Sequence, residues 1–175
     1  MNAAQLLQHQ LQGLHDEIVT HTLKGLTSKQ ANWQPNPKAN NLAFCLWHAL
    51  RVWDWDHFRM GGGAELYEAD GWPQRFGFET KGKGWKGLGF GTDFTIEDIA
   101  GMPMQPDVLA AYADALRART QQYLATVSDS ELAHEFEHQW RPGVMLTPAQ
   151  VLSHTIAHTY LHVGEAQYVK GLQEA

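Results

Sequence analysis

Three histidines recur at intervals of four residues near the end of the chain, at His154, His158 and His162. Because a helix turns by about 100° per residue, steps of four place these side chains along one stripe, one turn apart. A His-x-x-x-His pair on a helix presents two imidazoles to one metal ion. A site that supports chemistry also needs a third protein ligand and a position left open for water or substrate. The spacing therefore predicts a metal site and leaves open which pair of the three forms it.

His48 is the best candidate for the third ligand, because it stands between Cys45 and Val52 in an apolar stretch and should point inward. His57 and His21 are weaker candidates. The first stands near the end of its predicted helix, and the second belongs to the inner face of an earlier helix. Inward imidazole nitrogens must be satisfied by hydrogen bonds or by a metal. A polar seam of purely structural histidines is therefore the alternative to a metal site.

Other chemistries have less support in the sequence. The chain has no phosphate-binding glycine loop, no G-x-S-x-G motif and no C-x-x-C pair. Cys45 stands three residues before His48 and is a candidate nucleophile, although a lone cysteine in an apolar stretch more often packs in a core. Since it is the only cysteine, an internal disulfide is excluded and a reducing cytoplasm is favoured.

Four amphipathic helices are predicted to carry these residues. The first covers 3–26, the second begins at Asn40 or Asn41 and runs to about Met60, and the third begins at Pro106-Asp107. The fourth has a capping box at Thr147 and runs to Lys170. These helices predict an all-α fold, an antiparallel four-helix bundle in a single domain over 1–175.

The two long connections between the predicted helices, 61–105 and 128–146, have different compositions. Residues 61–105 hold 11 of the 16 glycines without a sustained period, which predicts a long glycine-rich loop between the second and third helices. Residues 128–146 are expected to connect the third and fourth helices, with a short extended piece around 134–140. Trp53 and Trp55 are apolar residues left over near a helix end, which indicates that one face of the bundle is covered, as a homodimer would cover it.

Composition narrows the set of partners. The 175 residues include 13 Lys and Arg against 19 Asp and Glu, for a net charge of −6 with neutral histidine. An acidic chain is poorly suited to bind nucleic acid or an anionic membrane, since both are bound by positively charged protein surfaces. No apolar stretch approaches the roughly 18 residues that span a bilayer, and the first residues lack the features of a signal peptide. A cytoplasmic protein with a small-molecule substrate is the expectation.

Motifs at both ends and in the middle of the chain resemble one family. The stretch from Gly25 to Asp54, with its Leu-Thr, Trp-Gln-Pro and Trp-His48 elements, is similar to the opening of the DinB-like (YfiT-like) metalloenzyme superfamily. The segment Gly71-Trp-Pro-Gln-Arg-Phe-Gly77 resembles one that follows in longer members. The end of the chain, His158-x-x-x-His162-x-Gly-Glu165, is similar to the family's final His-x-x-x-His-x-Gly-Gln motif.

The resemblance implies a four-helix bundle with one divalent metal ion, zinc or nickel, held by His48, His158 and His162. His154 would then stand in a second shell around these ligands. Glu165 departs from the glutamine of many members, and its carboxylate would orient His162 or act as a catalytic base.

Relatives include mycothiol- and bacillithiol-dependent transferases. The resemblance therefore implies an S-transferase that uses a low-molecular-weight thiol as co-substrate and acts on small electrophiles. The alternatives are a metal-dependent hydrolase, in which Glu165 is the base, and a metal-binding stress-response protein without turnover.

Overall fold

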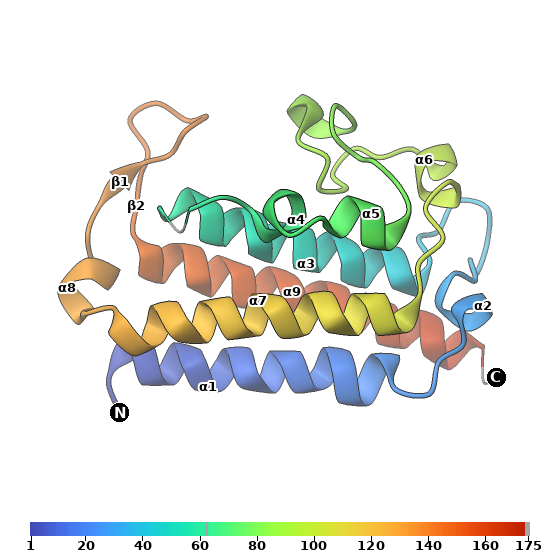
Figure 1. The fold of residues 1–175 in the computed structure, drawn as a ribbon, viewed down its shortest axis with the longest axis horizontal. Helices are drawn as coiled ribbons and strands as arrows, with labels where there is room; N and C mark the ends of the chain where they lie inside the picture. Colours follow the sequence, from blue (N-terminus) through green and yellow to red (C-terminus); the bar gives the residue numbers. More distant parts are fainter. Residues whose placement is uncertain (62, 174–175) are drawn as a thin grey trace.

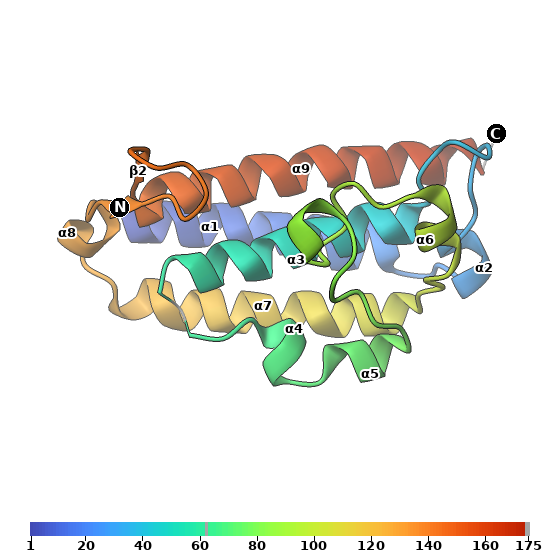
Figure 2. The ribbon, with the colours of Figure 1, turned by 90° about the horizontal axis from the view of Figure 1, so that it is seen from above.

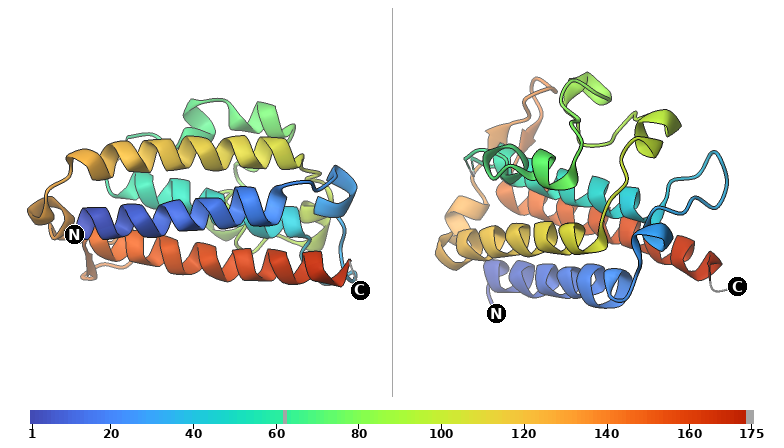
Figure 3. Two further views of the ribbon diagram at one scale, coloured as in Figure 1. Left: turned by 90° about the horizontal axis from the view of Figure 1, so that it is seen from below. Right: turned by 45° about the vertical axis from the view of Figure 1, so that its right-hand side comes forward.

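The computed structural model describes residues 1–61 and 63–173, and it confirms the predicted all-α class (Figure 1). Its four long helical segments are α1 (Ala3–Asp16) with the π-helical continuation η1 (Glu17–Leu23), α3 (Leu42–Arg59), α7 (Pro106–Thr126) and α9 (Pro148–Leu172). Both α3 and α1 pack against α7 and α9. Seen from above, α3 lies between α9 and α7 (Figure 2), and seen from below, α1 lies between the same two helices (Figure 3).

Local sequence signals set most of the helix ends. The Asn41 side chain accepts a hydrogen bond from the Phe44 amide and caps α3, so this is the cap of the two predicted candidates. Thr147 and Gln150 form the predicted capping box of α9, whose first residue is Pro148. The helix then continues slightly beyond the predicted end, to Leu172.

The first helix differs from a regular α-helix over its last seven residues, where η1 has π-helical geometry. Within it, the Thr22 hydroxyl donates to the Glu17 carbonyl oxygen five residues earlier, at 2.7 Å. Gln167 of α9 donates to both the Glu17 carboxylate and the Thr22 hydroxyl. These contacts support the wider turn, which periodicity alone does not reveal.

Two tryptophans predicted to need a second copy are covered by their own chain. Trp53 is buried and its indole N–H donates to the Thr120 hydroxyl of α7 at 3.0 Å. Trp55 is also buried and stacks on Trp140, with ring centroids 4.8 Å apart. The argument for a homodimer from these two residues is therefore wrong.

The segment 61–105 is more ordered than a single long loop. It contains α4 (Leu66–Ala69), α5 (Trp72–Phe76), the 3-10 turn η2 (Trp85–Gly87) and α6 (Ile96–Ala100). Each is only about one turn long, too short to produce a periodic pattern in the sequence. Aromatic contacts hold the first part of the segment on α7, including Trp72 at a centroid distance of 4.8 Å from Tyr112.

The connection 128–146 contains α8 (Asp129–Leu132) and a small antiparallel pair, β1 (Phe136–Glu137) and β2 (Met145–Leu146), with Phe136 opposite Leu146. The strand β1 falls within the extended piece predicted for 134–140. In the part of the chain that the structure describes, no helix is both long and apolar enough to cross a membrane.

Asp54 of α3 anchors the segment that follows α3. Its side chain is fully buried, and its two oxygens accept hydrogen bonds from the Leu66 and Tyr67 amides at 2.9 and 2.8 Å. These amides open α4, so the carboxylate acts as the N-terminal cap of that helix. The Tyr112 hydroxyl of α7 donates to the same carboxylate at 2.7 Å, and Arg51 lies 3.5 Å from it.

We expect Asp54→Asn to lower the free energy of unfolding by about 3 kcal/mol, because an amide group removes the buried charge and turns an acceptor into a donor facing N–H groups. Urea denaturation followed by far-UV circular dichroism measures the change. Asp70→Asn is the control, since Asp70 is exposed. Equal denaturation midpoints for the two variants would contradict the anchoring role of Asp54.

Candidate metal centre

The structure brings together the three histidines that the sequence analysis selected. His48 comes from α3, and His158 and His162 come from successive turns of α9. One ring nitrogen of each lies within 4.8 Å of the others, and all three residues are half-buried. The ring centroids are 5.1 Å apart for His48 and His158, 4.8 Å for His48 and His162, and 4.5 Å for His158 and His162.

Hydrogen bonds on the far side of two rings fix their orientation. The Nδ1 atom of His48 lies 2.6 Å from the Phe90 carbonyl oxygen, and the Nδ1 atom of His162 lies 2.6 Å from the Glu165 carboxylate. A carbonyl or carboxylate oxygen only accepts, so each Nδ1 is the donor and each Nε2 keeps its lone pair. Both imidazoles thus present the form that binds a metal ion.

The spacing of His158 and His162 fits a shared cation. The Nε2 atoms of His158 and His162 lie 3.3 Å apart. Two nitrogens at about 2.0–2.1 Å from a tetrahedral zinc ion are separated by about 3.3 Å, which follows from the tetrahedral angle. At this distance either a proton on His158 Nε2 or a metal ion shared by both rings satisfies the lone pair of His162 Nε2. The donor set therefore fits a divalent ion of the kind that imidazoles bind.

Burial keeps His48 and His158 neutral at physiological pH, because it lowers the pKa of both side chains. It lowers the pKa of His48 to about 4, an effect to which His162 adds and which the hydrogen bond to the Phe90 carbonyl partly offsets. Burial also lowers the pKa of His158 to about 3, together with repulsion from the neighbouring imidazoles. Protons therefore compete weakly with a metal ion at these two side chains.

His154 lies beside the cluster and outside it. Its side chain is 54% exposed, and its Nδ1 atom lies 3.0 Å from the Asp56 carboxylate of α3. Its ring centroid is 5.5 Å from that of His158. The three equally spaced histidines of α9 thus divide into a pair that meets His48 and a third that meets Asp56.

Glu165 contacts the Nδ1 side of His162, whereas the cluster is formed on the Nε2 side. Its side chain is 46% exposed. This position suits a carboxylate that orients the imidazole and increases its basicity. It is less suited to a base that must reach a substrate on the opposite side of the ring.

The remaining candidates lie elsewhere. Cys45 is buried, and burial together with the nearby Glu165 raises the pKa of its thiol to about 12, so the thiol is protonated and packs in the core. His57 is buried against Tyr123 of α7, outside the cluster. His21 is exposed, so its predicted inward position is wrong.

Sequence reasoning did not identify the residues that place a loop over His48. Phe90 supplies the carbonyl oxygen for His48, and Gly91 follows with φ +106°. A Cβ atom at Gly91 would lie 2.7 Å from His48 Nδ1, so only glycine permits this approach. The closely spaced glycines of 82–91 were the signal in the sequence that the backbone here approaches another part of the chain closely.

We expect Gly91→Ala to lift this loop from His48 and to speed trypsin cleavage after Lys81, Lys83 and Lys86. The added methyl group would both strain the backbone and collide with the imidazole. Gly77→Ala is the matched control, because Gly77 has φ +80° but no atom within 4 Å of an added Cβ. If the two variants are cleaved at the same rate, steric contact with His48 does not explain the glycine.

Comparison with known proteins places this geometry in a family. The sequence model described as the DinB superfamily matches residues 10–166. A crystal structure of a conserved protein from Enterococcus faecalis is similar with a TM-score of 0.80 and 24% sequence identity, over 97% of this chain and 96% of that chain. No curated protein matches the chain. At this identity the structural likeness concerns the fold, and the sequence match spans most of the residues. The chain therefore belongs to the DinB superfamily.

Proposed function

We propose that His48, His158 and His162 hold one divalent metal ion, zinc or nickel, in an enzyme that transfers a low-molecular-weight thiol to small electrophiles. The observation that carries the proposal is the convergence of three ring nitrogens within 4.8 Å, with two of the rings fixed from behind. An ion with three imidazole ligands and an open position lowers the pKa of a bound thiol or water and so supplies a nucleophile near neutral pH.

In this proposal the chain's own residues prepare the site. The Phe90 carbonyl and the Glu165 carboxylate hold His48 and His162 with their Nε2 lone pairs directed into the cluster. Glu165 is a positioning residue for His162, and His154 is a second-shell residue that borders the site. Phe90 and Gly91 lie against the His48 ring on the side of its Nδ1 atom.

Two further features belong to the same proposal. The four long helices form the antiparallel bundle of the superfamily, with 61–105 as its glycine-rich insertion. A homodimer is also proposed, now on account of α9, where Leu161 and Tyr168 are 61% and 70% exposed. Light scattering during size-exclusion chromatography tests it, and the mass of a single chain would refute it.

We expect about one zinc or nickel ion per chain in protein purified without a histidine tag or a nickel column, counted by plasma mass spectrometry. His48→Ala and His158→Ala should each remove it, because two remaining imidazoles rarely retain an ion. His21→Ala is the matched control, since His21 is exposed and outside the cluster. If the protein is purified without metal and also fails to bind added zinc and nickel, the histidines have a structural role only.

Conjugation of a small thiol to a model electrophile, 1-chloro-2,4-dinitrobenzene, should require both the metal and the thiol. We expect His158→Ala to lose at least about 100-fold in rate, since changing even a residue that supports a metal ligand costs about 10–100-fold and this variant removes a ligand itself. Cys45→Ala should retain the rate, because the Cys45 thiol is buried and protonated. A His158→Ala variant as fast as the parent protein would refute the transferase.

Glu165→Gln separates the transferase from the hydrolase. The amide oxygen can still accept from His162, so an orienting role predicts conjugation within about tenfold of the parent rate. Ester hydrolysis without thiol, abolished by the same substitution, would instead support a hydrolase with Glu165 as base. Bound metal with neither activity would favour the non-catalytic metal-binding protein.

A further inference from the structure

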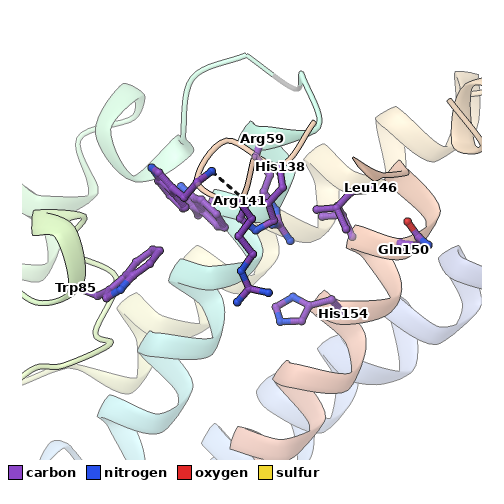
Figure 4. A pocket seen from close by; sticks show the side chains of 10 residues that line it. Arg59, Trp85, His138, Arg141, Leu146, Gln150 and His154 are labelled. Atoms are coloured by element: carbon purple, nitrogen blue, oxygen red, sulfur yellow. Dashed lines mark hydrogen bonds between the residues drawn. The ribbon is translucent and has the colours of Figure 1, made fainter. Parts of the chain in front are cut away.

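A separate pocket of about 340 Å³ lies next to the histidine cluster (Figure 4). Trp85 of η2 stands on one side of it, and Leu146 of β2 stands on the other, with Gln150 and His154 of α9. His154 joins the pocket to the cluster, since its ring is 5.5 Å from that of His158.

Three indoles from distant parts of the chain form the apolar wall of the pocket. Trp140 stacks on Trp55 with an interplanar angle of 5°, and it meets Trp85 edge to face at 90° with centroids 5.0 Å apart. Trp85 and Trp140 remain half-exposed. Partly exposed indoles at right angles offer both a face and an edge to a flat ring.

The polar part of the pocket carries positive charge. Arg59 and Arg141 line it together with His138 and His154, and Lys86 lies 5.3 Å above the Trp140 ring. None of the described residues that line it is acidic, although the chain has a net charge of −6. The nearby Asp56 is occupied by Arg59, His154 and Thr155. Because Arg59 is paired with Asp56 at 2.8 Å, Arg141 and the neighbouring Lys86 supply the positive charge that a ligand in the pocket would meet.

The positive charge around the pocket also lowers the pKa of His138. Its pKa lies below the ordinary value, through desolvation first and then through repulsion from Arg59, Arg141 and Lys86. Three cations therefore act on the His138 side chain. They come from α3, from the turn between β1 and β2, and from the glycine-rich segment 61–105. Such a site attracts an anion and repels a cation.

We propose that this pocket binds a small aromatic carboxylate, with its ring against the indoles and its carboxylate at Arg141, beside the Arg59–Asp56 pair. Arginine suits a carboxylate because its planar fork donates two parallel hydrogen bonds. As the substrate class of the enzyme, this inference rests on the proposed function, whereas binding itself does not require the metal.

Isothermal titration calorimetry with 2-naphthoate and its neutral analogue 2-naphthamide tests the inference. The carboxylate should bind at least about tenfold more tightly, and Arg141→Gln should remove this preference while leaving the amide nearly unchanged. Trp140→Ala should weaken both ligands. Arg75→Gln is the control, because Arg75 lies 4.4 Å above the Trp72 ring and does not line the pocket.

The same titration in chelated protein and in His158→Ala separates this inference from the proposed metal site. A preference for naphthoate that survives both treatments supports the pocket even if the metal proposal fails. Equal affinities for the two ligands in the parent protein would overturn the inference. So would a preference that disappears with the metal but survives Arg141→Gln, because the histidine cluster would then bind the carboxylate.

Discussion

Where α3 packs against α9, polar side chains of the two helices face each other at two positions along the contact. At one level Asp56 accepts hydrogen bonds from His154 and Thr155. Two turns back along α3, His48 meets His158 and His162, which lie further along α9, so the helices run antiparallel. A shift of one residue in either helix would rotate these side chains by about 100°. The candidate metal centre and the pocket beside it both depend on this register.

The glycine-rich segment 61–105 is attached to α3 at two places, one that anchors the segment and one that orients a histidine of the site. Its first turn is held by the buried Asp54, and its later part crosses α3, where the Phe90 carbonyl meets His48. The Phe90 ring packs against Trp55, with centroids 5.6 Å apart. One segment therefore orients an imidazole of the cluster and supports the aromatic wall of the adjacent pocket. A rigid attachment of this kind is what preorganised sites need.

Much of the candidate site could be predicted from the sequence, because its signals are local. The four-residue interval of the α9 histidines follows from helix geometry, and the apolar surroundings of His48 indicated an inward side chain. The partners behind the rings could not be predicted in the same way. Phe90 contributes a backbone carbonyl, which any residue carries, and its distance along the chain from His48 gives no periodic signal.

The sequence by itself determined the all-α class, the four long helices, the caps of α3 and α9 and the shared stripe of the α9 histidines, since each depends on residues within a few turns of one helix. Only the tertiary structure decided that His154 pairs with Asp56 while His158 and His162 face His48. It also decided that Trp55, Trp85 and Trp140 share one wall. These pairings depend on helix register and on close backbone approach at Gly91, which are properties of packing between distant segments.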